Sequence, residues 1–267
     1  MRDAGKRNIL GILIDAVDYD YAINFVLQAA RNKQPAMVSA LAVHGLMTGV
    51  LDREHKFRLN RFDLLVPDGQ PVRWVLNWLY HTRLADRVYG PTLTRRLCAQ
   101  AAAEGLPVYF YGSTPAVLTA LSRSLGEAFR GLIIAGMEPS KFRRLTPSEK
   151  EELATRIRAS GASVLFVGLG CPRQEVFAYE FRVALEMPVL AVGAAFPFLA
   201  GFVPQAPQWM QDRGLEWLFR LVSEPRRLWR RYLYLNPAYA LLVALQMLGV
   251  SRFPTNGQAP RSELLYG

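Results

Sequence analysis

Short apolar runs alternate with longer segments of helical periodicity, and this alternation restricts the fold more than any other feature of the chain. The apolar runs are NILGILIDA, AMVSAL, FDLLVPDG, LPVYFYG, GLIIAG, SVLFVGLG and PVLAVGAAF. Between most of them lie segments of about ten residues or more in which apolar residues recur at helical spacing. Strands separated by such helices form right-handed crossovers, so the pattern predicts an α/β fold with a mostly parallel, Rossmann-like sheet and helices on both faces.

The same patterns place the helices and a domain boundary. Helices are expected at about residues 20–32, 43–51, 70–80, 92–104, 115–129 and 172–185. A further helix begins after Thr146, which forms a capping-box pattern with Glu149. After about Pro204 the strands stop, and helical segments rich in arginine and aromatic residues follow. We therefore expect an α/β domain over residues 1–203, a helical appendage over 204–250 and a polar tail over 251–267.

Composition restricts the partners and the compartment. The net charge of +10 favours an anionic partner: nucleic acid, a phosphorylated small molecule or an acidic membrane surface. Cys98 and Cys171 form no CxxC pattern, which indicates a reducing compartment. His44, His55 and His81 show no metal-ligand spacing, so no metal site is expected. The N-terminus does not resemble a signal peptide, so a cytosolic location is expected.

In a parallel sheet, ligands bind beyond the carboxyl ends of the strands, so the loops there should carry the chemistry. Asp68 follows a strand in VPDGQP, where a carboxylate can act as a general base. The commoner explanation is an Asp-Gly turn in which Asp68 caps the next helix. Arg87, in DRVYGP, can hold a diphosphate with two parallel hydrogen bonds, although a lone arginine is more often simply solvated.

Two further loops join a strand end to a helix start. Ser113 and Thr114, in FYGSTP, offer hydroxyls beside free helix amides, which suits a phosphate but equally an ordinary N-cap. In VGLGCPRQE, Gly168 and Gly170 allow a ligand to approach the backbone. The third glycine of a dinucleotide fingerprint is missing and no GK[ST] follows, so this loop is either a ligand loop or a tight structural turn.

The motifs become specific when they are taken in order. VPDGQPV, RVYGP, YFYGST, VGLGCPRQE, VGAAFPFLAG and QAPQWMQDRGLEWLFRLVSEPRRLWRRY follow one another along the chain. In this order they resemble the WecG/TagA/CpsF family of bacterial glycosyltransferases, glycosyltransferase family 26, over about Asn8 to Tyr232. The most specific part is PRQE followed by GLEWLFRL and EPRR.

The resemblance implies inverting transfer of a sugar from a UDP-sugar to an undecaprenyl-diphosphate-linked saccharide, with no catalytic metal and no other cofactor. It implies a peripheral enzyme at the anionic cytoplasmic face of the bacterial inner membrane. The products in the family are cell-surface polymers such as exopolysaccharide, capsule or teichoic acid. Nucleic acid is then not a partner, while homo-oligomerisation, the donor sugar and the acceptor saccharide stay open.

The resemblance also carries residue roles onto this sequence. The family's base falls on Asp68, its active-site arginine on Arg87 and its conserved glutamine on Gln174. Its diphosphate-facing arginines map to Arg220, Arg227 and Arg230. With the strand-end loops, the expected donor-binding residues are Ser113, Thr114, Gly168, Gly170, Arg173 and Gln174.

The chain departs from the family pattern in two places. It reads Ala40-Leu41-Ala42 where many members have Thr-x-Asn, and only His44 nearby is polar, so His44 is assigned to the acceptor side. It also reads Phe196-Pro197-Phe198 where members often have Phe-Asp-Phe. Both departures leave the donor sugar undefined, and N-acetylmannosamine is not assumed.

The stretch LEWLFRLVSEPRRLWRRYLYLNP interleaves five arginines with aromatic and aliphatic residues. Pro225 divides it into two helices, because proline lacks an amide donor and disfavours helical geometry at Glu224. The apolar side of the second helix either packs on the α/β domain or lies in an anionic membrane interface. The resemblance favours the membrane, and the expected contacts are Arg226, Trp229, Arg231 and Tyr232.

Residues 238–250 are apolar but shorter than the roughly 20 residues that span a bilayer, so peripheral attachment is expected. Two other function classes fit single features of the chain. A nucleic-acid-binding protein would explain arginine beside aromatic residues, but it does not need Asp68 at a strand end. A nucleotide-dependent oxidoreductase would explain the alternating fold, but GxGxxG is missing.

Overall fold

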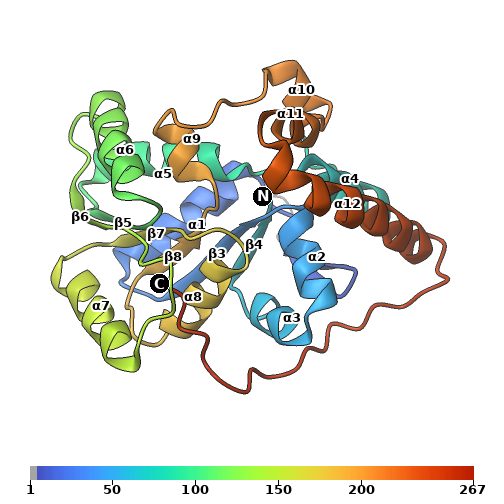
Figure 1. The fold of residues 1–267 in the computed structure, drawn as a ribbon, viewed down its shortest axis with the longest axis horizontal. Coiled ribbons are helices and arrows are strands. Elements are labelled where there is room, and N and C mark those ends of the chain that lie inside the picture. Colours follow the sequence, from blue (N-terminus) through green and yellow to red (C-terminus); the bar gives the residue numbers. More distant parts are fainter. Residues whose placement is uncertain (1–4) are drawn as a thin grey trace.

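The computed structural model describes residues 5–267, except for the side chains of Arg227 and Arg231. A six-stranded sheet with the order β4-β3-β8-β7-β5-β6 lies at its centre (Figure 1). Its strands are β3 (Ala36–Leu41), β4 (Leu64–Pro67), β5 (Val108–Gly112), β6 (Ile134–Glu138), β7 (Val164–Gly168) and β8 (Pro188–Ala191). Every pairing in this sheet is parallel, which confirms the expected fold class.

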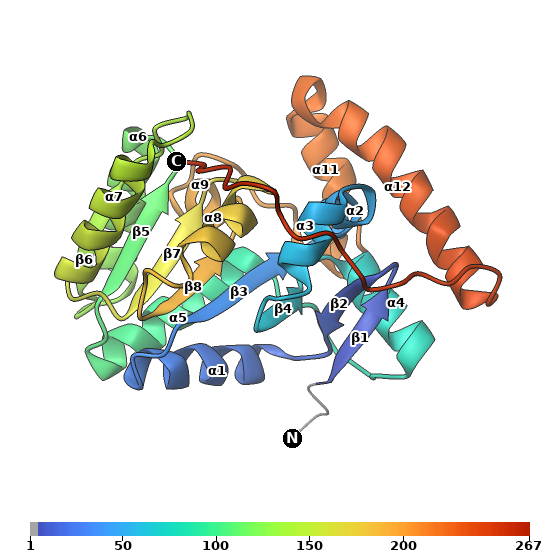
Figure 2. The same cartoon turned by 90° about the horizontal axis from the view of Figure 1, so that it is seen from below.

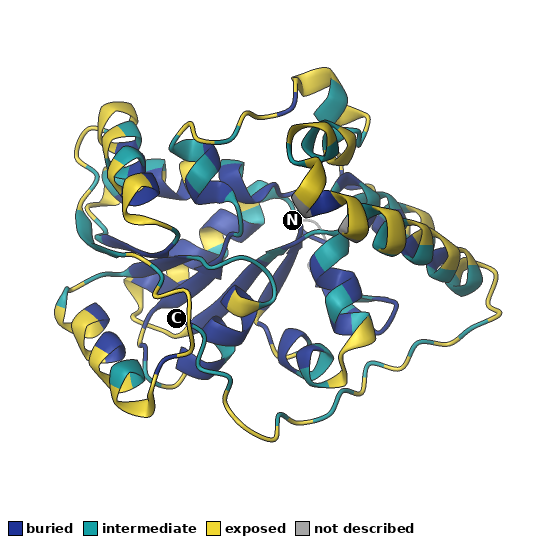
Figure 3. Cartoon of the chain, in the orientation of Figure 1, coloured by how far each residue is buried: buried dark blue, intermediate teal, exposed yellow. Residues whose placement is uncertain are grey.

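Two hydrophobic layers cover the sheet, which explains why its central strands read as continuous apolar runs. One layer packs α1 (Tyr19–Arg31), α5 (Gly90–Glu104), α6 (Pro115–Ala128) and α9 (Ala195–Leu199) on one face. The other packs α2 (Val43–Leu51), α3 (Arg53–Leu59), α4 (Gln70–Tyr80), α7 (Pro147–Ala159) and α8 (Arg173–Phe181) on the opposite face. Burial is concentrated in the strands and the inward helix faces (Figure 3).

The first apolar run does not form the single strand that its sequence suggests. β1 (Lys6–Ile9) pairs antiparallel with β2 (Ile12–Asp15) in a separate two-stranded sheet. The chain reverses at Leu10 and Gly11, both at positive φ (53° and 89°), a region that glycine adopts at little cost. The Asp15 carboxylate accepts hydrogen bonds from Lys6 Nζ (2.8 Å) and from the Leu65 amide (2.7 Å), which fastens the hairpin beside β4.

The C-terminal part contains α10 (Gln208–Asp212), α11 (Glu216–Ser223) and α12 (Pro225–Met247), so the two helices expected around Pro225 are confirmed. α12 continues through Pro237 and buries Tyr239 and Val243 against the layer that contains α2 and α4. Figure 2 shows α11 and α12 beside α2 at one end of the sheet. None of the helices in residues 5–267 has both the length and the apolar character of a membrane span.

Residues 251–267 run back across the surface to the α/β part of the molecule (Figures 1 and 2). The amide of Gln258 donates to the Arg53 carbonyl (2.9 Å). The Glu180 carboxylate accepts from the amides of Leu264 (2.7 Å) and Leu265 (2.9 Å). The segment expected as a polar tail is therefore held to the α/β domain by backbone hydrogen bonds.

Two glycines give a matched test of this packing. A Cβ atom on Gly112 (φ +114°) would lie 2.8 Å from the Gly168 carbonyl carbon, whereas one on Gly126, in α6, would meet nothing within 4 Å. Gly112→Ala should lower the free energy of unfolding by about 3 kcal/mol through strain and clash. Gly126→Ala should raise it by about 0.5–1 kcal/mol, since alanine favours the helix. Urea unfolding followed by circular dichroism measures both, and equal effects would contradict this account of the β5–β7 contact.

Candidate active site

A cavity of about 470 Å³ lies at the carboxyl ends of the strands. Its wall includes residues from the loops after β3, β4, β5, β7 and β8 and from α11 and α12. Because the strands of a parallel sheet all end at the same edge, residues far apart in sequence meet here. The cavity is thus enclosed by the α/β domain on one side and by the C-terminal helices on the other.

Asp68 stands directly after β4 in the cavity wall. Its Oδ1 accepts a hydrogen bond from the Gly90 amide at the start of α5 (2.7 Å). The N-cap of α4 is Gly69, with no side-chain cap, so Asp68 does not have the capping role that its Asp-Gly turn suggested. Burial raises the pKa of Asp68 to about 6, although Arg87, the Gly90 amide and Arg220 lower it. The carboxylate can therefore accept a proton near neutral pH.

Arg87 forms a buried ion pair across the cavity. Its Nη2 donates to Glu216 Oε2 (2.6 Å) and to Gln211 Oε1 (3.1 Å), and the two ion-paired side chains are only 7% and 12% exposed. Its guanidinium lies 4.3 Å from the centre of the Tyr89 ring. Arg87, predicted to meet a diphosphate, thus joins the α/β domain to α10 and α11.

Arg220, from α11, contributes a second arginine to the cavity wall. Its guanidinium lies 5.5 Å from the ring centre of Phe198, which follows the Pro197 position where the chain departs from the family pattern. Its Nε is buried and has no hydrogen-bond acceptor among the described residues. An unsatisfied cationic donor in a cavity wall suits an anionic ligand.

The glycine-rich loop after β7 is held to the neighbouring loop by Gln174. Gln174 Oε1 accepts a hydrogen bond from the Gly193 amide in the loop after β8 (2.9 Å), and Gln174 Nε2 donates one to Glu175 (2.9 Å). Burial raises the pKa of Glu175, which hydrogen bonds from Gln174, Ser39 and Cys171 partly offset. On the next loop, Thr114 is the N-cap of α6 and accepts from the Val117 amide (3.4 Å), so its hydroxyl serves the helix while it lines the cavity.

One cluster next to the cavity could hold a metal ion. His55, Cys171 and Glu175 each offer one ligand atom, and these atoms lie within 4.8 Å of one another. Cys171 and Glu175 also line the cavity. The spacing of the histidines gave no sign of this cluster, because its members come from α3, from the loop after β7 and from the start of α8.

Comparison with known families agrees with this geometry. A family model described as glycosyl transferase WecG/TagA/CpsF family matches residues 7–252. The chain belongs to the WecG/TagA/CpsF family. It is therefore a glycosyltransferase, and the cavity at the strand ends is its candidate active site.

Most residues predicted for the site of this glycosyltransferase line this cavity. They are His44, Asp68, Arg87, Ser113, Thr114, Gly168, Gly170, Gln174 and Arg220. Arg173 is absent from the described lining and lies 5.7 Å from the Tyr266 ring centre. Arg230 is likewise absent and lies beside the Trp229 ring (5.2 Å), exposed on α12. The predicted roles of Arg227 and Arg231 fall on side chains outside the described residues.

Tyr232 was predicted to face the membrane, but it lies in the cavity wall. Tyr232 lines the cavity and meets Trp217 edge to face, with ring centres 6.0 Å apart. Its helical spacing from Leu228, which is 1% exposed, places both on the inward side of α12, while Trp229 is 43% exposed. Sequence reasoning also missed Glu216, Trp217 and Asn236 as lining residues. For Glu216 the family motif GLEWLFRL was the one available signal.

The ion pair gives a stability test. Glu216→Ala leaves Arg87 buried without its anionic partner, so unfolding free energy should fall by about 3 kcal/mol. Arg87→Ala combined with Glu216→Ala should cost clearly less than the sum of the single changes, because the pair is removed together. Urea unfolding of the four proteins measures the coupling. Glu127→Ala, an exposed glutamate on α6, is the control and should stay near wild type; additive effects at 87 and 216 would rule out the pair.

Proposed function

We propose that this glycosyltransferase moves a sugar from a UDP-sugar to a polyprenyl-diphosphate-linked saccharide, with inversion at the anomeric carbon. The observation that supports this most directly is Asp68, a strand-end carboxylate with a raised pKa in a cavity that also holds Arg87 and Arg220. Family membership supports sugar transfer. Transfer from a UDP-sugar needs a base and cationic groups that bind phosphate, and this cavity has both.

In this proposal Asp68 is the general base. Its Oδ1 is held by the Gly90 amide, and Oδ2 takes the proton from an acceptor hydroxyl. The hydroxyl oxygen forms a bond to the anomeric carbon while the bond from that carbon to the UDP oxygen breaks, and UDP leaves with the electron pair. A single displacement of this kind inverts the anomeric configuration.

Arg220 then stabilises the charge that grows on the departing diphosphate. Its buried, unsatisfied Nε is suited to that oxyanion, whereas Arg87 is already engaged with Glu216. Arg87 accordingly acts as a positioning residue that holds α11, and with it Arg220, over the strand ends. We infer that these groups take the place of a divalent ion at the diphosphate. The helical appendage, residues 204–250, is in this view part of the active site.

Asp68 generates a mutational and a pH prediction. Asp68→Asn should lower kcat by about 100-fold or more, the scale of a general base, while UDP still raises the melting temperature. In wild type, kcat/KM should fall about tenfold per pH unit below the pKa of about 6, because protonated Asp68 cannot accept a proton. UDP release from a panel of UDP-sugars with a lipid-diphosphate acceptor measures both.

The matched control is Asp20→Asn, which changes an exposed aspartate on α1 and should behave as wild type. Near-normal turnover of folded Asp68→Asn, or a wild-type profile that stays flat through pH 6, would remove Asp68 from the mechanism. Stabilisation by NAD or by DNA in place of UDP would favour the other two function classes.

We also propose attachment to an anionic membrane surface through α11 and α12. Their outward faces expose large apolar side chains, namely Val222 (74%), Trp229 (43%), Leu233 (61%), Tyr234 (66%) and Leu241 (62%). Exposed Arg226 and Arg230 stand on the same helix. An apolar face bordered by arginine, with tryptophan and tyrosine present, suits the headgroup region of a bilayer. The inner leaflet of a bacterial membrane would place the lipid-linked acceptor beside the cavity.

Substitutions at three arginines can distinguish membrane binding from catalysis. Arg226→Gln and Arg230→Gln should each weaken binding to anionic vesicles by about 1 kcal/mol and leave turnover of a short-chain, soluble acceptor near wild type. Arg220→Gln should slow that turnover and leave vesicle binding unchanged. Arg123→Gln, at an exposed position on α6, is the control. If the three variants behave alike in vesicle sedimentation and in the soluble assay, this division of roles is wrong.

A further inference from the structure

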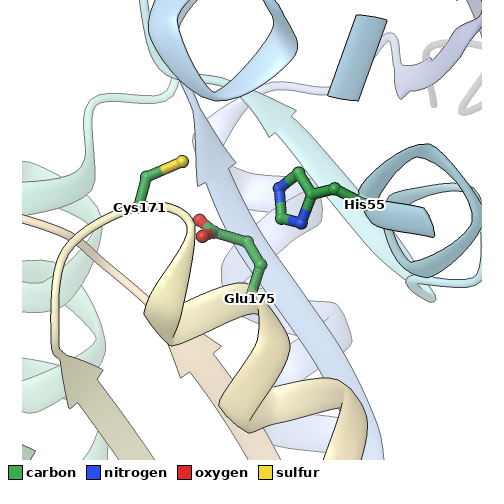
Figure 4. Close-up of side chains that lie close together, drawn as sticks. All are labelled: His55, Cys171 and Glu175. Atoms are coloured by element: carbon green, nitrogen blue, oxygen red, sulfur yellow. The ribbon is translucent and has the colours of Figure 1, made fainter. Parts of the chain in front are cut away.

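The cluster of His55, Cys171 and Glu175 joins three segments of the chain at the edge of the cavity. His55 comes from α3, Cys171 from the loop after β7, and Glu175 from the first turn of α8. Figure 4 shows the His55 ring pointing toward the Glu175 side chain, whose carboxylate is turned toward Cys171. Their ligand atoms lie within 4.8 Å of one another, against about 3.5 Å between the ligands of a tetrahedral zinc ion. Side-chain movements of about an ångström would bring the three ligand atoms to that spacing.

The polar atoms of this cluster are buried and incompletely satisfied. His55 is 1% exposed, and neither ring nitrogen has a hydrogen-bond partner among the described residues. Glu175 is also 1% exposed; its Oε1 accepts from Ser39 (3.0 Å) and Gln174 (2.9 Å), and its carboxylate also interacts with Cys171. Buried polar groups are satisfied in most proteins, so a buried histidine with two unsatisfied ring nitrogens beside a thiol and a carboxylate points to a ligand shared by the three groups.

The chemistry of the three groups identifies the class of ligand. Imidazole nitrogen, thiolate sulfur and carboxylate oxygen are the donors that zinc prefers. A divalent cation would balance one thiolate and one carboxylate, so the bound site would be neutral, as a buried site requires. Alkaline-earth ions prefer oxygen ligands and fit this set poorly.

We propose that His55, Cys171 and Glu175 bind a zinc ion. Three protein ligands leave a fourth position, which water takes in sites of this kind. The ion would tie α3 to the loop Gly168–Cys171 and the start of α8, and so fix the wall of the cavity next to Gln174. This role is positional and differs from that of a metal at the donor diphosphate.

The test measures metal content and therefore does not depend on transfer activity. Full-length protein is purified without an immobilised-metal step, dialysed with zinc, separated from free metal and analysed by mass spectrometry. About one zinc per chain is expected in wild type. Cys171→Ser and His55→Asn should each lose it, whereas Cys98→Ser, which changes the buried cysteine on α5, should retain it. Zinc should also raise the melting temperature of wild type by roughly 5 °C at saturation.

Cobalt gives a second readout that needs no folded variant. Cobalt bound to wild type should show thiolate-to-metal charge-transfer absorption, and that band should be absent when Cys171 is blocked by alkylation beforehand. Zinc at background level in wild type, or zinc retained in both Cys171→Ser and His55→Asn, would overturn the proposal. The cluster would then be a hydrogen-bonded part of the core.

Discussion

The buried pair between Arg87 and Glu216 is the contact on which the geometry of the site depends. It joins the loop after α4 to α11, and without it the C-terminal helices would lose their one buried charged attachment among the described ion pairs. A pair of this kind is costly to desolvate, and its replacement by apolar residues often leaves stability unchanged or higher. Its value here therefore lies in placement, because it fixes α11 with Arg220 facing the strand ends.

The same pair also sets the electrostatics around Asp68. Arg87 lowers the pKa of Asp68, Glu216 raises it, and the two effects oppose each other. Burial has the largest effect on Asp68, so the pKa rises to about 6. An arginine without Glu216 would keep Asp68 a weaker base.

The sequence predicted the sheet well because parallel strands buried on both faces must be apolar throughout, and their helices must be long enough to cross over. The prediction of one strand at NILGILIDA was wrong, because a pattern of buried residues does not reveal the turn at Gly11 that divides this run into two strands. Sequence reasoning also missed α3, whose seven residues are mostly polar, and α9, which contains a proline. Short helices of this kind are stabilised by tertiary contacts rather than by local preference.

The candidate site was also predictable only in part. Residues at strand ends, such as Asp68 and Gln174, could be predicted because topology alone brings the carboxyl ends of parallel strands together. Side-chain direction is not given by topology, and for that reason Tyr232 turned inward and Arg173 turned toward Tyr266. The cluster around His55 was missed for a related cause: His55 is more than 100 residues from Cys171 and Glu175 in sequence, and spacing rules detect ligands only when they are close neighbours.

The C-terminal helices have two faces that contact different surroundings. Their inner side supplies Glu216, Arg220 and Tyr232 to the cavity, while their outer side exposes Trp229 and other large apolar groups. Exposed apolar surface on a single element is stable in water only at a cost, so it indicates a partner of matching polarity. A lipid-linked diphosphate has both polarities in one molecule, with an apolar chain and an anionic head. The two sides of α11 and α12 therefore match the polarity of the acceptor proposed above, with the apolar side suited to the lipid chain and the inner side to the diphosphate and its sugar.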